Sequence, residues 1–357
     1  MTIANEPLLS HLATQGAVSG TMRGHTAPLH FGDAAAEYDA LTGSAAVAPL
    51  LDVTSLDVIG ADRARLLHNM CTANVNALTV GSGTEAFFTN VQGHVVGYGW
   101  LYCRPDRFTV DLIGGSPTEL IAHLDRYVIR EDVQFEDRSG DRVTLLVAGP
   151  TAANVVGALG GAVPAGLLDN TETALKLTDG NVDAFLRRVE LTGSDGFFVS
   201  VAADRAAALW DALTASGARQ CGCSAVETRR IERGIPLFGV DVTPDNLPQE
   251  VDRNQQAISF TKGCYIGQET VARLDALGHV NRTLGGLKFA ATTPPAELAA
   301  GGELSLDGKA VARLTSVAQS RALGAPLALA YLRRGHETAG TLLQSTPHPA
   351  EVVPLPV

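Results

Sequence analysis

The order strand, breaker, helix occurs twice along this chain, and this internal repeat constrains the fold more than any other feature. Residues 56–67 (LDVIGADRARLL) align with residues 144–156 (TLLVAGPTAANVV). Residues 106–124 (DRFTVDLIGGSPTELIAHL) align in the same way with residues 195–213 (DGFFVSVAADRAAALWDAL). Two copies of a strand–helix–strand–strand–helix unit are typical of ferredoxin-like lobes, so we expect an α+β fold with two such lobes. Chance similarity of two common supersecondary units is the alternative.

The two ends of the chain follow other patterns. Residues 1–45 are irregular apart from a short helix predicted at 34–41. From Leu284 onward, short strand-like runs alternate with glycine-rich turns, and Asp307-Gly308 is a strong hairpin signal. This tail predicts a small C-terminal β-barrel domain. The expected domains are an N-terminal α+β lobe (1–140), a second α+β lobe that contains a cysteine-bearing loop (141–283), and the β-barrel domain with its tail (284–357).

Charge and cysteine content exclude several classes of partner. The chain has 357 residues, with 27 Lys and Arg against 38 Asp and Glu, so its net charge is −11. A protein that coats nucleic acid or binds an anionic membrane would need the opposite sign. The N-terminus lacks the basic start and apolar block of a signal peptide, and the longest apolar runs are too short to cross a bilayer. Because five cysteines do not form a disulfide framework, we expect a cytoplasmic protein with reduced thiols and no metal site.

Residues 259–274 (SFTKGCYIGQETVARL) are the most informative for chemistry. Lys262 lies two residues before Cys264, and its positive charge favours the thiolate form of the cysteine. A helix that begins just after Cys264 would favour the thiolate further through the positive end of its dipole. Gly263 and Gly267 permit tight turns or the close approach of a ligand or another backbone. A packed, unreactive cysteine is the alternative. None of the nine histidines stands at a spacing that assigns a Cys–His pair.

A second polar segment covers residues 227–241 (ETRRIERGIPLFGVD). It gathers three arginines and two glutamates on one short element: Arg229, Arg230, Arg233, Glu227 and Glu232. This pattern fits either a solvated helix face with weak ion pairs or a guanidinium that holds a carboxylate or a planar heterocycle. Other basic residues follow as far as Lys288, so we expect a locally basic pocket suited to a small anion.

The segment Lys262-Gly-Cys-Tyr-Ile-Gly-Gln-Glu269 resembles the K-G-C-[FY]-x-G-Q-E motif of the YgfZ family. These are folate-binding proteins related to the aminomethyltransferase (T-protein) of the glycine cleavage system. Residues 230–236 (RIERGIP) resemble the R-I-E-x-G-x-P segment of that superfamily, and residues 308–316 (GKAVARLTS) resemble a run in its barrel domain. The resemblance covers roughly residues 50–335. It implies a T-protein-like fold in which two α+β lobes and a terminal β-barrel enclose a central folate channel.

The resemblance also implies partners and site residues. The family is implicated in making or maintaining iron–sulfur proteins, including enzymes that modify tRNA, without direct contact with nucleic acid. The implied partners are tetrahydrofolate or a derivative and iron–sulfur client or assembly proteins. Cys264 is the implied reactive thiol and Lys262 the residue that tunes it. The implied residues of the motif loop are Gly263, Tyr265, Gly267, Gln268, Glu269 and Arg273. The implied folate-binding residues are Arg230, Glu232, Asn90, Tyr98 and Tyr102.

Two departures from the superfamily pattern separate this chain from its transferases. Aminomethyltransferases carry G-G-[IV]-x-D-D, in which an Asp contacts folate and assists methylene transfer; residues 92–98 (QGHVVGY) have Gly97 and Tyr98 at the acidic positions. They also carry Y-T-G-E-x-G-[FYW]-E, whose last Glu bonds the pterin, where this chain has Leu191 and Phe198. No carboxylate remains there as a general acid or base.

The sequence therefore predicts a folate-binding accessory protein for iron–sulfur proteins, and not an active aminomethyltransferase. A folate-dependent one-carbon enzyme, either an aminomethyltransferase or a demethylase-like protein, is the first alternative. A scaffold that binds neither folate nor cluster is the second.

Overall fold

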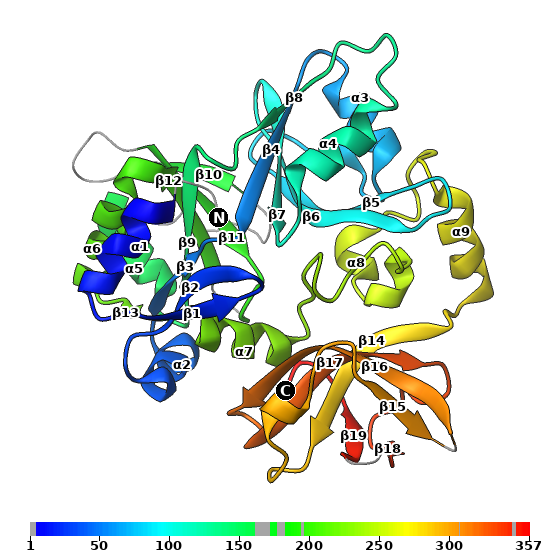
Figure 1. Ribbon diagram of the computed structural model, residues 1–357. Coiled ribbons are helices and arrows are strands. Elements are labelled where there is room, and N and C mark those ends of the chain that lie inside the picture. Colours follow the sequence, from blue (N-terminus) through cyan, green and yellow to red (C-terminus); the bar gives the residue numbers. More distant parts are fainter. Residues whose placement is uncertain (1–4, 161–171, 177–182, 194–195, 307, 345–347) are drawn as a thin grey trace. The chain divides into compact units, whose positions relative to one another are not determined.

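The computed structural model describes residues 5–160, 172–176, 183–193, 196–306, 308–344 and 348–357 (Figure 1). The chain forms two compact units. The first unit comprises residues 1–67, 75–85 and 99–226, and the second comprises residues 68–74, 86–98 and 227–357. The chain therefore passes repeatedly from one unit to the other, and strands β5 and β6 each continue across this division.

Two sheets in the first part of the chain repeat one strand order, and the second also contains a parallel pair, β13 with β3. The first sheet runs β5-β6-β7-β4-β8 and the second runs β10-β11-β12-β9-β3-β13. The first contains β4 (Val53–Ile59), β5 (Gly83–Thr89), β6 (Val95–Cys103), β7 (Arg107–Ile113) and β8 (Gln134–Asp137). The second contains β3 (Ala46–Leu50), β9 (Arg142–Ala148), β10 (Glu172–Lys176), β11 (Asp183–Val189), β12 (Gly196–Ala202) and β13 (Arg219–Gln220).

The aligned segments of the sequence occupy equivalent places in these two sheets. Residues 56–67 and 144–156 form β4–α3 and β9–α5, and the second aligned pair forms β7–α4 and β12–α6. Each copy has three consecutive strands between its helices, one more than the repeat predicted. The predicted α+β fold with two related lobes is confirmed.

Six helices of the described chain accompany these sheets: α1 (Glu6–Thr14), α2 (Ala34–Gly43), α3 (Arg63–Met70), α4 (Pro117–Asp125), α5 (Ala152–Gly160) and α6 (Ala206–Ala215). Ser116 starts α4, because its hydroxyl accepts a hydrogen bond from the Glu119 amide and Pro117 occupies the first turn. The prediction of an irregular N-terminus is wrong. Residues 1–45 contain α1 and a hairpin of β1 (Val18–Met22) and β2 (His25–His30) in addition to the predicted helix.

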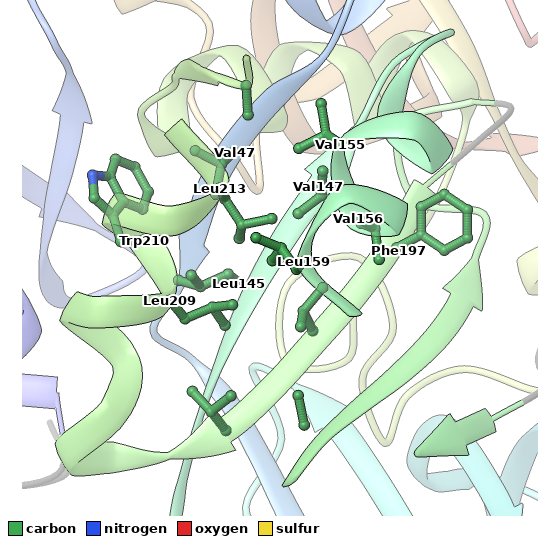
Figure 2. Close-up of a cluster of buried hydrophobic side chains, with 14 of the residues drawn as sticks. Val47, Leu145, Val147, Val155, Val156, Leu159, Phe197, Leu209, Trp210 and Leu213 are labelled. Atoms are coloured by element: carbon green, nitrogen blue, oxygen red, sulfur yellow. The ribbon is translucent and has the colours of Figure 1, made fainter. Parts of the chain in front are cut away.

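The core of the first unit lies between the second sheet and helices α1, α5 and α6 (Figures 1 and 2). Figure 2 shows Val47, Leu145 and Val147 of the strands against helical side chains. Those helical side chains include Val155, Val156, Leu159, Leu209, Trp210 and Leu213. Full burial of one such aliphatic side chain stabilises the fold by about 1.5–3 kcal/mol, so this apolar face fixes the sheet in place.

The opposite face of the second sheet carries polar side chains. Arg187 of β11 and Asp111 of β7 form an ion pair, and both are fully buried. The hydroxyl of Ser55 donates to Asp111 at 2.6 Å, and Arg187 also donates to Ser200 at 3.2 Å. This pair links the two sheets inside the first unit. Removing one partner would leave a buried charge uncompensated.

The second unit contains the end of α7 (Cys223–Arg233), two short turns, α9 and a barrel-like sheet. The turns are η4 (Pro248–Val251) and α8 (Asn254–Ala257), and α9 spans Gln268–Leu277. The sheet order is β15-β16-β17-β14-β19-β18. Its strands are β14 (Arg282–Phe289), β15 (Glu303–Leu306), β16 (Lys309–Ser320), β17 (Ala325–Arg333), β18 (Leu342–Leu343) and β19 (Ala350–Val353).

The predicted C-terminal barrel is thus confirmed. Strands β15 and β16 pair in antiparallel fashion with Leu306 opposite Lys309. Gly308 has φ +73, as a tight hairpin requires, while Asp307 of the predicted turn lies outside the described residues.

Candidate functional site

The cysteine-bearing loop, residues 259–267, runs beside residues 69–73 of the second unit. The Ser259 amide donates to the Thr72 carbonyl and the Ile266 amide donates to the Asn69 carbonyl, both at 2.9 Å. The Thr72 hydroxyl in turn donates to the Ala257 carbonyl at 2.6 Å. Backbone hydrogen bonds therefore fix both ends of the loop to a segment nearly two hundred residues earlier in the chain.

Lys262 anchors the middle of the cysteine loop. Its buried ammonium donates to the carbonyl of His68 in the last turn of α3, and to those of Cys71 and Ala73 at 2.8 and 2.7 Å. Helix ends leave carbonyls without intrahelical donors and carry partial negative charge, so a cation is well placed there. Burial lowers the pKa of Lys262, opposed by the Cys71 thiol, but the three acceptors match the three N–H groups of the ammonium form.

The contacts of Lys262 differ from the predicted role. We expected its charge to act on Cys264, but the ammonium is directed to the three carbonyls and lies 4.9 Å from the centre of the Tyr265 ring. In this structure Lys262 is a positioning residue that holds the loop against the end of α3. Its effect on the Cys264 thiol stays a prediction.

Gly267 is required by close packing of two backbones. It has φ +79, and a Cβ there would lie 2.5 Å from the Asn90 carbonyl oxygen and 2.8 Å from the Cα of Gly93. Gly93 has φ +86, and a Cβ on it would lie 2.8 Å from the Cβ of Thr270. The Thr270 hydroxyl completes the contact by donating to the Gln92 carbonyl at 2.8 Å. The turn at residues 90–94 thus packs on the first turn of α9, as expected for Gly267.

No close contact requires a glycine at position 263. The side chain nearest to Gly263 in space is His68, which the sequence analysis did not identify. A Cβ on Gly263 would meet the Nε2 atom of His68 at 3.8 Å, an ordinary contact. His68 is buried, and burial together with the Lys262 charge lowers its pKa. Its Nδ1 atom is buried without a hydrogen-bond partner in the described part of the chain. A neutral imidazole therefore lies beside the residue that precedes Cys264.

Cys264 is exposed, whereas Cys71, Cys221 and Cys223 are buried and Cys103 is half-buried; none of the five forms a disulfide bond. Burial raises the pKa of Cys71, Cys103 and Cys221 and so keeps them protonated. Cys264 is thus the cysteine best placed to meet a partner or reagent.

The other predicted loop residues surround this thiol in the second unit. Tyr265 is buried, and the Gln268 amide donates to its carbonyl at 3.2 Å. Burial raises the pKa of the Tyr265 phenol, which therefore stays neutral. Helix α9 begins at Gln268 with Glu269 in its first turn, and both Glu269 and Arg273 are exposed. A carboxylate in the first turn stabilises the helix that follows the loop.

Arg230, which we expected to hold folate, is fully engaged inside the second unit. It is buried, and its five N–H donors go to Glu227 (two bonds), Asp241 at 2.9 Å, Ser316 at 2.7 Å and the Ile235 carbonyl at 3.1 Å. Burial alone would lower the pKa of Arg230, but Glu227 and Asp241 more than offset it, and the pKa is raised. Every N–H donor of the guanidinium is thus used within the protein, and the role of Arg230 as a folate ligand stays a prediction.

Glu232 and the neighbouring cations are also paired. The Glu232 carboxylate accepts from Arg229 at 2.6 Å, from Ser320 at 2.7 Å and from the Ala322 amide at 3.2 Å. Arg282 pairs with Glu250 at 3.1 Å. Glu232 is thus an acceptor for three protein groups, its role as a folate ligand stays a prediction, and these pairs reduce the expected local excess of positive charge.

The three remaining folate candidates also have contacts within their own units. The Asn90 side-chain oxygen accepts from the Gln92 and His94 amides of its own turn, both at 3.0 Å. Tyr98 is buried and stacks on Phe87, with 4.7 Å between ring centres. Tyr102 belongs to the first unit, where it is fully buried with the Arg187 guanidinium over its ring. The assignment of these five residues to folate stays a prediction.

The positions that differ from the transferase pattern are filled by apolar packing. Phe198 of β12 is fully buried, and its ring meets Trp100 edge to face at 5.7 Å in the first unit. Leu191 is also buried there, and Gly97 is buried in the second unit. These side chains offer no carboxylate or other polar group.

The described residues lack a metal-binding cluster and a membrane-spanning helix. No cluster of three or more His, Cys, Asp and Glu side chains among them is arranged to hold a metal ion. None of their helices combines the length and apolar character needed to span a bilayer.

Comparison with known proteins places this geometry in a family. The sequence profile of the GCVT N-terminal domain matches residues 8–262, and that of the glycine cleavage T-protein C-terminal barrel domain matches residues 282–357. The chain belongs to the glycine cleavage T-protein family. Members of this family bind folate.

Similar proteins of this T-protein family cover almost the whole chain. A protein named aminomethyltransferase from Saccharopolyspora erythraea is 28% identical over 358 residues, which cover 96% of this chain and 94% of that protein. A putative chloroplast transferase of Arabidopsis thaliana is 28% identical over 313 residues, covering 85% of this chain and 68% of that protein. The crystal structure of the glycine cleavage system aminomethyltransferase T from Bartonella henselae matches with a TM-score of 0.82 at 22% identity, covering 98% of this chain and 96% of that one. This structural match establishes the T-protein fold.

Proposed function

We propose that this T-protein family member is of the YgfZ type and acts as a folate-binding accessory factor for iron–sulfur proteins rather than as an aminomethyltransferase. The observation that carries the proposal is the cysteine loop. Its one thiol is exposed, while Lys262, Gly267 and two backbone hydrogen bonds hold the surrounding residues in place. A fixed loop that presents an exposed thiol suits contact with a client protein, because little ordering is needed on binding.

The apolar replacements support the absence of aminomethyl transfer. Proton transfer in such a reaction needs a side chain that can gain or lose a proton within hydrogen-bond reach of the substrate. Gly97 and Phe198 have no such group, and Phe198 is packed against Trp100. We therefore expect no turnover of an aminomethyl donor.

The folate part of the proposal rests on the family. Because Arg230 and Glu232 are engaged by protein groups, folate must be held by other residues or the protein must rearrange to receive it. Calorimetric titration of the purified protein with tetrahydrofolate and with its 5-formyl derivative tests this point. We expect one bound folate per chain, with unchanged affinity in the control Glu303→Gln, an exposed residue of β15. No binding of either folate at millimolar concentration would refute this part.

A folate-dependent one-carbon enzyme is the second candidate. The observation that favours it is the near full-length match to proteins named aminomethyltransferase. The discriminating assay incubates the protein with tetrahydrofolate and an aminomethyl or N-methyl donor and measures methylene- or methyltetrahydrofolate. Product above a no-protein control would replace our proposal by this one.

The organisation that accompanies this proposal has three domains, at residues 1–140, 141–283 and 284–357, in a cytoplasmic protein. Limited proteolysis tests the boundaries, since exposed interdomain connections are cleaved first. Stable fragments that begin or end far from residues 140 and 284 would contradict them.

A further inference from the structure

A cavity of the second unit lies where the end of α9 meets η4, α8 and the segment that follows β17. Its volume is about 350 Å³, within the roughly 300–1,000 Å³ of sites for small molecules. The turn η4 packs against α8, α9 and β14, and this packing brings the walls together. All described residues that line the cavity belong to the second unit, and none of them belongs to the cysteine loop.

Two amide side chains of the lining have a buried oxygen that lacks a donor. Gln249 is 7% exposed, and its Nε2 atom donates to the Val271 carbonyl at 2.6 Å. Because a carbonyl only accepts, this bond fixes the orientation of the amide and leaves Oε1 as an acceptor. Neither Gln249 Oε1 nor Asn254 Oδ1 has a hydrogen-bond partner in the described part of the chain. The cavity therefore favours an occupant that donates hydrogen bonds.

The charged side chains at the cavity favour a cation. Asp252, Asp275 and Glu337 supply three carboxylates, and Arg334 is the one guanidinium among the described lining residues. Within the described chain no ion pair holds any of these three carboxylates. Arg253 acts on Asp252 through its charge but has other interactions as well. Even with Arg253 counted, carboxylates outnumber guanidinium groups, so the potential inside the cavity is negative.

The end of helix α9 adds to this negative potential. Asp275 stands in the last turn, which has no basic residue, and the helix dipole already places partial negative charge there. His279 follows the helix, with its Nδ1 atom 2.9 Å from the Leu277 carbonyl oxygen. Since that oxygen only accepts, Nδ1 carries the proton of the neutral ring and Nε2 is a further acceptor. Glu250 of η4 pairs with Arg282 of β14 at 3.1 Å and so leaves the balance unchanged.

We propose that this cavity binds a small organic ammonium ion, whose N–H groups donate to the side-chain oxygens of Gln249 and Asn254 and whose charge the carboxylates balance. An ammonium group has three N–H donors and no acceptor, which matches a lining rich in acceptors. A bare metal ion suits the cavity less, because no three His, Cys, Asp or Glu side chains of the described residues are arranged to coordinate one. The site does not depend on the proposed role of the cysteine loop.

Isothermal titration calorimetry with putrescine tests the site at about pH 8, where an alkylammonium keeps its proton. The buffer contains about 0.15 M NaCl, which reduces the screening length to about 8 Å and limits binding through the overall acidity of the chain. We expect one bound putrescine per chain with a Kd below about 1 mM. Fully N-methylated putrescine has the same two charges and no N–H donor. This matched ligand should bind at least about tenfold more weakly, because it cannot donate to the amide oxygens.

Variants of the carboxylates test the location of the site. Asp252→Asn/Glu337→Gln removes two of the three and should weaken putrescine binding about tenfold. The φ of Asp252 is +60, a conformation that Asn tolerates as well as Asp, so the backbone is preserved. Glu303→Gln, at an exposed carboxylate of β15 in the same unit, is the matched control and should leave the Kd unchanged.

Three results would overturn the proposal. The first is the absence of putrescine binding at about 1 mM, because a Kd above this value corresponds to less than about 4 kcal/mol. The second is equal affinity for putrescine and its fully N-methylated form, which would show attraction by charge alone. The third is an equal change of affinity in the double variant and in Glu303→Gln.

Discussion

Replacement of Lys262 by Met removes the ammonium that binds three carbonyls and keeps a side chain of similar length. The carbonyls of His68, Cys71 and Ala73 then lose their donor in a buried place. Each buried acceptor left without a partner costs about 1–3 kcal/mol, which gives a gross loss of about 3–9 kcal/mol. Met no longer buries a charge, and water can reach some of the carbonyls. We therefore expect a net loss of about 3–5 kcal/mol in the free energy of unfolding, the range seen when one member of a buried pair is removed.

Urea denaturation followed by far-UV circular dichroism measures this loss. Both tryptophans, Trp100 and Trp210, belong to the first unit, so their fluorescence would not report directly on the unit that contains Lys262. Lys309→Met, at an exposed lysine of the same unit, is the matched control and should change the free energy of unfolding by less than about 0.5 kcal/mol. A loss below about 1 kcal/mol in Lys262→Met, with an unchanged slope against urea, would refute the anchoring role.

Three further predictions follow from the same structure. Gly267→Ala should lower the free energy of unfolding by about 2–4 kcal/mol, because φ is +79 and the new Cβ would lie 2.5 Å from the Asn90 carbonyl oxygen. The control Gly263→Ala should change the free energy of unfolding by less than about 0.5 kcal/mol. Equal losses in the two variants, measured by urea denaturation, would contradict this prediction. Burial and Lys262 lower the pKa of His68, so as the pH falls below the ordinary value of 6.5 the unfolded chain binds a proton at His68 before the folded chain does, and the free energy of unfolding decreases until the lower folded pKa is reached. His68→Gln should make this decrease on the acid side shallower. An unchanged pH dependence of the melting temperature in this variant would argue against the role of His68. Arg187→Met should lower the free energy of unfolding of the first unit by about 3–5 kcal/mol, measured by tryptophan fluorescence, since Asp111 remains buried and unpaired; a loss below about 1 kcal/mol would not agree with a buried ion pair.

Local patterns in the sequence were enough to predict the repeated lobes. Strands with continuous apolar runs, such as Arg142–Ala148, are followed by a breaker and a helix in both copies, and these signals depend only on neighbouring residues. The N-terminal hairpin was missed because Val18–Met22 is largely exposed and mixes polar and glycine residues. In the second lobe β10 was missed for a related reason, since it is short and its sequence is mixed.

The candidate site was predicted only in part because its partners are distant in sequence. The acceptors of Lys262 lie 194, 191 and 189 residues away, so no local pattern could show that its ammonium is already engaged. The contacts of Arg230 could not be predicted for the same reason, because Ser316 lies 86 residues beyond it. Gly267 was identified correctly, since a glycine that precedes a helix often adopts a positive φ. His68 carried no signal at all until the fold placed it beside Gly263.

Complementation of a deletion strain of the source organism tests the central claim most directly. Cells that carry the wild-type chain, Cys264→Ala or Cys103→Ala are compared for the activity of an iron–sulfur enzyme that modifies tRNA, with the amount of each variant measured in the same extracts. The account predicts that the wild type and the half-buried control Cys103→Ala restore the activity and that Cys264→Ala, present at an equal level, does not. Full restoration by Cys264→Ala would contradict it.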